Sequence, residues 1–217
     1  MAREGRPRVI KASGRREVIM NKNFIKEIVS RGGLVIYPTD TVYGLGCDPF
    51  NASAVRKIFE VKRRENKPLP VLARSLEDVK RIAYMNELAK RLAEIFWPGP
   101  LTLILRRRPT LPSEVTLGRN TVGVRIPNHE VALSLLEIVG GLFIGTSANI
   151  SGAPSPRTAN DAIAQLNGSV DLVIDSGPSP IGVPSTCIDL TTKPPRIIRL
   201  GALSISRIRN ILREVMV

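Results

Sequence analysis

The chain has 217 residues, 43% of them hydrophobic, which is enough for one substantial core and does not require a second domain. Bases outnumber acids by 32 to 19, and the resulting net charge of +13 favours polyanionic partners such as nucleotides or nucleic acid. The two cysteines form no CxxC pair, no apolar run approaches the roughly 20 residues of a membrane span, and the N-terminus is too polar for a signal peptide. We therefore expect a soluble cytoplasmic protein without membrane association.

The first segment of the chain is strongly basic. Residues 1–16 carry six bases against one acid, without helical or strand periodicity before Val9 and Ile10. We predict a basic N-terminal arm over 1–16 and a single domain over 17–217.

Helices and strands then alternate. Apolar residues at helical spacing after Asn21 predict a helix that Gly32 and Gly33 end, and 34–37 follows as a buried strand. Further helices are predicted after a cap at Asn51 or Ser53, after Ser75, through Leu88 to Phe96, and near 130–138, 158–167 and 204–215. Further strands are predicted over 70–73, 101–105, 121–126, 142–145, 171–174, 186–190 and 196–200.

This order of elements favours an α/β domain. Few helices separate the strands near the C-terminus, so we expect a mixed parallel and antiparallel sheet with flanking helices. Residues 176–185, rich in Pro, Ser and Gly, are typical of a surface loop with a ligand-contacting end at Ser185 and Thr186.

The signatures of common nucleotide and metal sites are absent. The chain has no G-x-x-x-x-G-K-[ST] and no G-x-G-x-x-G, which argues against a P-loop or a dinucleotide fold. His129 is the only histidine and starts a predicted helix, so a structural role is expected for it. Neither a His–Cys metal site nor a histidine-activated nucleophile is supported.

The segment Tyr37–Gly46 follows a buried strand directly and is dense in hydroxyls and glycines. Loops at this position in open α/β sheets commonly form the ligand crevice. The alternative is a Pro-Thr-Asp turn whose side chains only cap main-chain groups.

Cations and small polar groups recur at other element ends. Lys62 and Arg64 follow a predicted helix, Arg125 and Arg199 lie at strand ends, and 145–149 offers hydroxyls, an amide and free N–H groups. An exposed basic helix end, favoured by the helix dipole, would explain the first pair alone. Several cations at one sheet edge are costly without an anion, so the set indicates a phosphate-bearing ligand.

Seven segments occur in order from about Asn21 to Gly201, and each is a weak signal alone. They are Tyr37-Pro-Thr-Asp-Thr-Val-Tyr-Gly-Leu-Gly46, Lys62-x-Arg64, Pro98-Gly-Pro-Leu-Thr102, Val124-Arg-Ile-Pro127, Thr146-Ser-Ala-Asn-x-Ser-Gly152, Pro184-Ser-Thr186 and Arg199-x-Gly201. Together they resemble the YrdC-type threonylcarbamoyl-AMP synthase family.

The resemblance implies a twisted, open mixed sheet with a basic concave face. It also implies an ATP-dependent nucleotidyltransferase that converts L-threonine, bicarbonate and ATP, with Mg²⁺, to L-threonylcarbamoyladenylate and pyrophosphate. Partner proteins would then use the product for N6-threonylcarbamoyladenosine modification of tRNA.

The resemblance further implies roles for individual residues. The expected catalytic set is Lys62, Arg64, Ser147 and Asn149. The expected ATP contacts are Lys62, Asn66, Thr121, Ser147, Ser155 and Arg199. The expected threonine contacts are Thr39, Arg125 and Ser185, with Arg125 suited to the carboxylate.

The chemistry fits these residue types. A carbamate of the threonine amine is a weak, short-lived nucleophile, so the site has to hold it beside the α-phosphate while cations offset developing charge. Many relatives carry a second C-terminal domain that can cover the site. Here we expect closure from within the domain, from the arm or from a partner.

Two other functions compete. A double-stranded RNA or tRNA-binding module without catalysis would explain the charge, but it needs no compact hydroxyl-rich pocket such as Thr39 and Ser147 suggest. A carbamoyl-handling enzyme with another substrate, similar to a domain of hydrogenase-maturation carbamoyltransferases, is argued against by the absence of zinc motifs.

Overall fold

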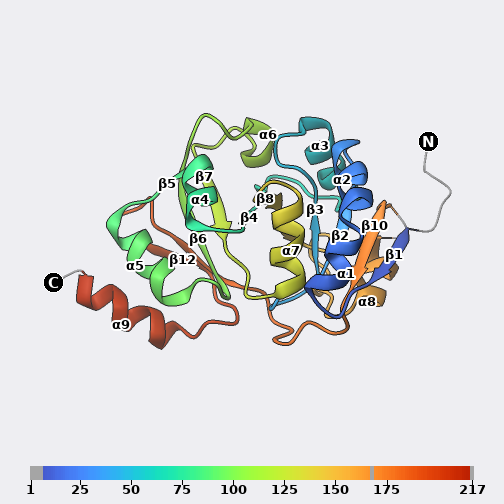
Figure 1. Ribbon diagram of the computed structural model, residues 1–217. Helices are drawn as coiled ribbons and strands as arrows, with labels where there is room; N and C mark the ends of the chain where they lie inside the picture. The colour runs from blue at the N-terminus through green and yellow to red at the C-terminus, as the bar shows by residue number, and fades with distance from the viewer. Residues whose placement is uncertain (1–6, 167–168, 216–217) are drawn as a thin grey trace.

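The computed structural model describes residues 7–166 and 169–215, and Figure 1 shows its strands in two groups with helices packed around them. One group is a five-stranded sheet. Its order is β1 (Arg8–Lys11), β10 (Leu172–Asp175), β2 (Val35–Tyr37), β3 (Gly44–Gly46) and β9 (Thr146–Ser147). The first three strands are parallel, and β3 runs antiparallel to β2 and β9.

The second group is a seven-stranded sheet that includes the longest strand, β6. Its order is β12 (Arg196–Arg199), β11 (Thr186–Asp189), β6 (Leu101–Arg107), β7 (Thr121–Arg125), β4 (Val71–Ala73) and β8 (Leu142–Ile144), with β5 (Ala83–Tyr84) beside β6. Parallel pairs (β11–β6, β4–β7) alternate with antiparallel ones. The predicted mixed sheet with flanking helices is confirmed, although its strands divide between two sheets.

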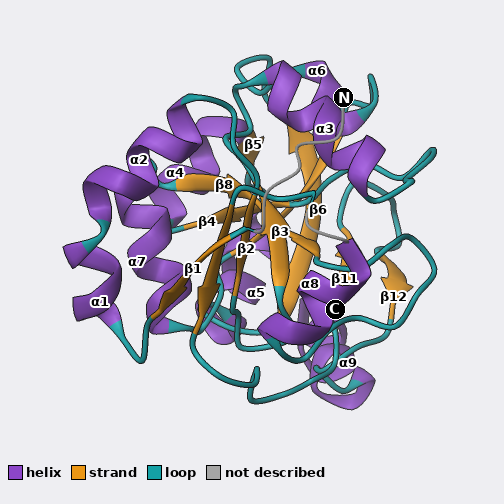
Figure 2. Ribbon diagram, turned by 90° about the vertical axis from the view of Figure 1, so that its right-hand side faces the viewer, coloured by secondary structure: helices purple, strands orange, loops and turns teal. Residues whose placement is uncertain are grey.

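The helices cover both faces of the five-stranded sheet (Figure 2). Val35 and Tyr37 of β2 pack in one apolar cluster with α1, α2 and α7, whereas Ile36 packs in the other with α3 and α8. This alternation follows from the two-residue side-chain period of a strand. The helices are α1 (Arg15–Met20), α2 (Lys22–Ser30), α3 (Ala52–Val61), α4 (Leu76–Ile82), α5 (Glu87–Phe96), α6 (Ser113–Thr116), α7 (Glu130–Ile138), α8 (Ala159–Leu166) and α9 (Ile205–Val215).

Part of the segment predicted as a basic arm belongs to the fold. Residues 8–11 pair with β10 as an edge strand, and α1 spans the predicted boundary at residue 17. The apolar pair Val9 and Ile10 is too short to reveal a strand without its partner, which lies more than 160 residues away in the sequence. Residues 1–6 lie outside the described residues.

Side-chain caps set several helix starts. Asn51, not Ser53, caps α3 by accepting a hydrogen bond from Ala54 N at 3.0 Å, and Ser75 caps α4 as predicted. Among the described helices, none has both the length and the apolar character that crossing a membrane requires.

The two sheets meet where β3 passes β8. Tyr37 Oη donates to Ile144 O at 2.7 Å, and Ile144 N donates to Cys47 O at 3.0 Å. A Cβ atom on Gly46 would lie 2.1 Å from Ile144 O and 2.6 Å from the Phe143 ring. Only glycine allows this approach, which brings the segment after β2 close to the second sheet.

We expect Gly46→Ala to lower the free energy of unfolding by about 3 kcal/mol, because the added methyl group overlaps backbone that cannot move freely. Gly123→Ala is the matched control, since its Cβ would meet nothing closer than Thr102 Cγ2 at 3.4 Å. Urea unfolding of both variants measures the difference. Equal stability of the two variants would show that the sheets do not need this close contact.

Candidate active site

A cavity of about 630 Å³ opens between the two sheets. Its walls come from the segment after β2, the segment after α3, strands β6, β7 and β9, and the region from Pro184 to Arg199. Most residues predicted for the site line it. They are Thr39, Arg64, Asn66, Thr121, Arg125, Ser147, Ser185 and Arg199.

Three predicted site residues do not line this cavity: Lys62, Asn149 and Ser155. Lys62 and Asn149 are buried behind the wall, and Ser155 is half-buried between two prolines. Direct contact of these three side chains with a ligand stays a prediction.

The end of α3 determines where the cations point. Arg64 N donates to Phe59 O at 2.9 Å and Arg63 N donates to Glu60 O at 3.0 Å, which is the Schellman pattern. Arg63 occupies the left-handed position of this motif, with φ of 48°, where glycine is usual. The chain therefore reverses after Lys62 without any glycine signal.

The Arg64 guanidinium is oriented by main-chain carbonyls. Its Nε donates to Lys67 O at 2.7 Å and its Nη2 donates to Pro68 O at 2.9 Å. Burial lowers the pKa of Arg64, and the positive charge of Arg199 lowers it further. Two guanidiniums that repel each other across a cavity are suited to bind an anion between them.

Lys62 lies behind the wall, with 1% of its surface exposed. Its Nζ donates to Ser147 O and Asn149 O, and its own carbonyl accepts from Ser151 N at 2.9 Å. This side chain therefore joins the Lys62–Arg64 segment to the 147–151 turn. Burial lowers its pKa to about 7, and the charge of Arg64 adds to that effect.

Arg125 is 5% exposed and joins the two sheets. Its Nη2 donates to Asp40 Oδ1, its Nη1 to Thr41 Oγ1 at 2.8 Å, and its Nε to Gly99 O at 2.9 Å. Burial lowers the pKa of Arg125, whereas the charge of Asp40 raises it. Three bonds leave two of the five guanidinium N–H groups for a ligand.

Thr39 both caps its turn and lines the cavity. Its Oγ1 accepts from Thr41 N at 3.2 Å and donates to Val42 O at 2.7 Å. The turn that sequence reasoning gave as an alternative explanation is present, and it holds the side chain at the wall.

Positive charge dominates the lining. Among the lining residues that the structure describes, five are Lys or Arg and none is Asp or Glu. Cys187 also lines the cavity, but burial raises the pKa of its thiol to about 11, so it stays protonated at neutral pH. No group of three or more His, Cys, Asp or Glu within the described chain is placed to hold a metal ion.

Sequence reasoning missed two cations of the lining, Lys67 and Arg119. Lys67 follows the predicted contact Asn66 directly, and Arg119 lies two residues before the strand predicted over 121–126. Arg119 Nη2 donates to Asn66 O at 3.1 Å across 53 residues of sequence. In the sequence, the signal for Arg119 is a positive residue in a turn beside a sheet edge. Only the fold shows that this residue lines the same cavity as the other cations.

We expect stability to rise with pH around the titration of Lys62. Its pKa is about 7 when folded and has its ordinary value of 10.5 when unfolded, so between these values the unfolded chain binds more protons. The free energy of unfolding should therefore increase with pH, by at most about 1.4 kcal/mol per unit, and Lys62→Met should remove this slope. Urea unfolding from about pH 7 to about pH 8.5 measures it.

Lys57→Met is the control, because Lys57 also donates to a main-chain carbonyl, that of Gly32, but lies only half-buried. It should keep the wild-type slope. If Lys62→Met also keeps that slope, Lys62 does not titrate in this range.

Comparison with known proteins identifies the family. The Sua5/YciO/YrdC family model, described as "Telomere recombination", matches residues 27–201. A threonylcarbamoyl-AMP synthase of Pyrococcus abyssi is 43% identical over 194 residues, covering 88% of this chain and 56% of that protein. The Bacillus subtilis protein of the same name is 38% identical over 188 residues, covering 84% of this chain and 54% of that protein.

The structural comparison agrees. The crystal structure of P. abyssi Sua5 complexed with L-threonine has a TM-score of 0.86 and 40% identity, covering 94% of this chain and 60% of that chain. The present chain thus spans somewhat more than half the length of these relatives. Sequence, fold and the order of the cavity segments all show that the chain belongs to the Sua5/YciO/YrdC family.

Proposed function

We propose that this protein is an L-threonylcarbamoyladenylate synthase, an ATP-dependent nucleotidyltransferase acting for N6-threonylcarbamoyladenosine modification of tRNA. The observation that carries the proposal is one cavity that combines cations, hydroxyls and no carboxylate among its described lining residues. The relatives named threonylcarbamoyl-AMP synthase and the relative solved with L-threonine support it.

The amino acid belongs on the Arg125 side of the cavity. The two remaining N–H groups of Arg125 suit its carboxylate, and the hydroxyl-bearing residues Thr39 and Ser185 also line the cavity. Asp40 keeps the guanidinium in place through the buried ion pair. This arrangement holds the amine still while its nitrogen forms a bond to the carbon of bicarbonate and water leaves, which yields the carbamate.

The nucleotide belongs on the side of Arg64 and Arg199, with Asn66, Thr121 and Ser147 nearby in the lining. The carbamate oxygen attacks the α-phosphorus, the bond from that phosphorus to the bridging oxygen breaks, and pyrophosphate leaves. The arginines stabilise the negative charge on the phosphate oxygens and on pyrophosphate. No protein nucleophile is needed, which agrees with the protonated thiol of Cys187.

Mg²⁺ belongs to the nucleotide substrate in this proposal. The described lining residues include no carboxylate, the side chain through which proteins usually hold Mg²⁺, so ATP phosphates and water have to supply its ligands. When bound, the ion neutralises part of the triphosphate charge.

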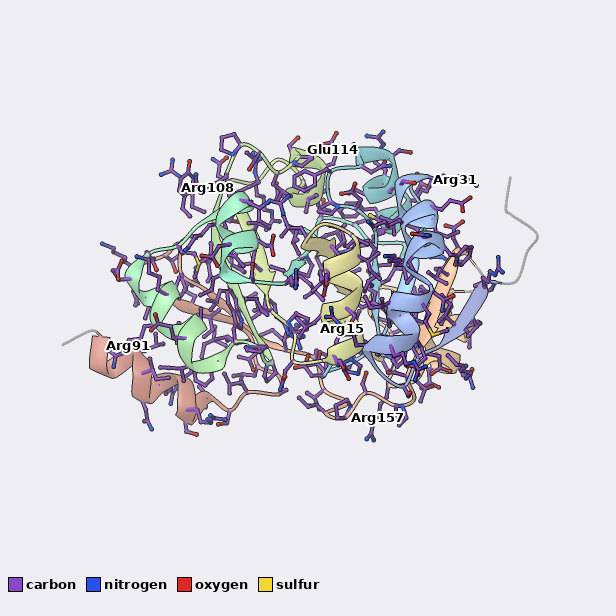
Figure 3. All side chains as sticks on the ribbon, viewed as in Figure 1. Arg15, Arg31, Arg91, Arg108, Glu114 and Arg157 are labelled. Carbon is purple, nitrogen blue, oxygen red and sulfur yellow. The ribbon has the colours of Figure 1, made fainter. Side chains whose placement is uncertain are left out.

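The RNA-binding alternative depends on surface charge and not on this cavity. The labelled Arg31, Arg91, Arg108 and Arg157 lie far apart around the molecule (Figure 3). Tracking of an RNA backbone requires a stripe of cations along one face. These four residues do not form such a stripe. Direct tRNA contact, the downstream partner proteins and a cytoplasmic location stay predictions.

The test is release of pyrophosphate from Mg²⁺-ATP and bicarbonate, with and without L-threonine, and with labelled bicarbonate followed into an adenylate. We expect release and labelling that depend on threonine, and both should stop when EDTA removes Mg²⁺. Release without threonine, or no release together with salt-sensitive RNA binding, would contradict the proposal.

Arg64→Ala should lower kcat/KM for ATP by about 100-fold, because it removes a partly desolvated charge from the phosphate side. Arg63→Ala is the matched control, since Arg63 carries the same charge one residue earlier but is exposed and does not line the cavity. Its activity should stay near that of the wild type. Equal losses in the two variants would show that net charge alone matters.

A further inference from the structure

Three neighbouring strands bring one polar chain to the cavity wall. Thr102 lies in β6, Ser185 directly precedes β11, and Arg199 ends β12. Thr102 Oγ1 and Ser185 Oγ are 2.8 Å apart, and Arg199 Nη2 donates to Ser185 Oγ at 3.2 Å. All three side chains line the cavity, and each hydroxyl residue is 6% exposed.

Arg199 is fixed to this chain by more than one bond. Its Nε and Nη2 donate to Ser185 O at 3.1 and 2.9 Å. Its positive charge also lowers the pKa of both Arg64 and Arg125. Arg199 is therefore within electrostatic reach of the phosphate side and the amino-acid side at once.

The donors in the chain can be counted. Ser185 Oγ already accepts from Arg199, so its own hydrogen goes either to Thr102 Oγ1 or to a ligand. In the first case the Thr102 hydrogen remains for a ligand, and in the second Thr102 donates to Ser185. Either way the pair offers one hydroxyl hydrogen to the cavity, and its direction depends on both partners.

We propose that Thr102 is a positioning residue that orients the Ser185 hydroxyl and, through the chain Thr102–Ser185–Arg199, couples binding of the amino acid to binding of the nucleotide. The proposal rests on the function proposed above. A carboxylate on the Ser185 side fixes the hydroxyl pair and thereby Arg199, and a phosphate at Arg199 fixes the pair for the carboxylate. The coupling is positive and reciprocal.

The experiment is calorimetric titration with L-threonine, in the absence and presence of saturating Mg²⁺-α,β-methylene-ATP. We expect wild-type protein to bind threonine at least about fivefold more tightly with the nucleotide. Thr102→Val should weaken threonine binding about tenfold. It should also bring the ratio of the threonine affinity with the nucleotide to that without it close to one. The affinity for the nucleotide alone should change little.

Two variants separate the hydroxyl from other effects. Thr102→Ser keeps the hydroxyl and should restore the wild-type ratio. Ser134→Ala removes a buried hydroxyl of α7 that does not line the cavity, and it should leave the ratio unchanged. Turnover should follow the same order, with a raised KM for threonine in Thr102→Val and, because the coupling is reciprocal, a smaller rise in the KM for ATP at saturating threonine.

A wild-type ratio in Thr102→Val, or the same loss in Thr102→Ser, would overturn the proposal. If Thr102→Val does not fold, Ser185→Ala removes the middle hydroxyl of the Thr102–Ser185–Arg199 chain and should also bring the affinity ratio close to one. A ratio that stays at the wild-type value in Ser185→Ala would overturn the proposal. Wild-type protein without threonine-dependent pyrophosphate release would contradict the proposed function instead, so the two failures are distinguishable.

Discussion

The structure depends on holding positive charges together around one cavity whose described lining contains no carboxylate. Main-chain carbonyls do most of this work, because they orient a guanidinium or ammonium group but carry no net charge. Arg64 is held by Lys67 O and Pro68 O, and Arg199 by Ser185 O. Burial lowers the pKa of Arg64, repulsion from Arg199 lowers it further, and an anion bound between the two guanidiniums relieves this repulsion. The polyphosphate of the proposed nucleotide substrate fits this constraint.

The two-sheet architecture sets the distances between these groups. Arg125 lies at the end of β7, yet its ion-pair partner Asp40 follows β2 of the other sheet. Breaking such a buried pair costs about 3–5 kcal/mol, so the sheets cannot move apart easily at this point. The proposed catalysis by positioning needs this rigidity, since in that proposal a carbamate is held against a phosphorus atom without help from a protein nucleophile.

Much of the fold and of the cavity lining is predictable from sequence, but the separate roles of the cations are not. Periodicity and caps gave most helices and strands, and the segments around Thr39 and Arg125 gave the cavity wall. The three-residue strand Gly44–Gly46 has no propensity signal, because tertiary pairing alone creates it. The Lys62 side chain lies behind the wall and bonds the carbonyls of Ser147 and Asn149, which lie more than 80 residues away, so no local pattern predicts this arrangement; its contact with a ligand stays a prediction.

The most direct measurement is a crystal structure of the protein with Mg²⁺-α,β-methylene-ATP and L-threonine. The account predicts the triphosphate between Arg64 and Arg199 and the threonine carboxylate on Arg125, with Lys62 still bonded to the carbonyls of Ser147 and Asn149. A nucleotide bound outside this cavity, or a triphosphate that leaves both arginines without contact, would contradict it.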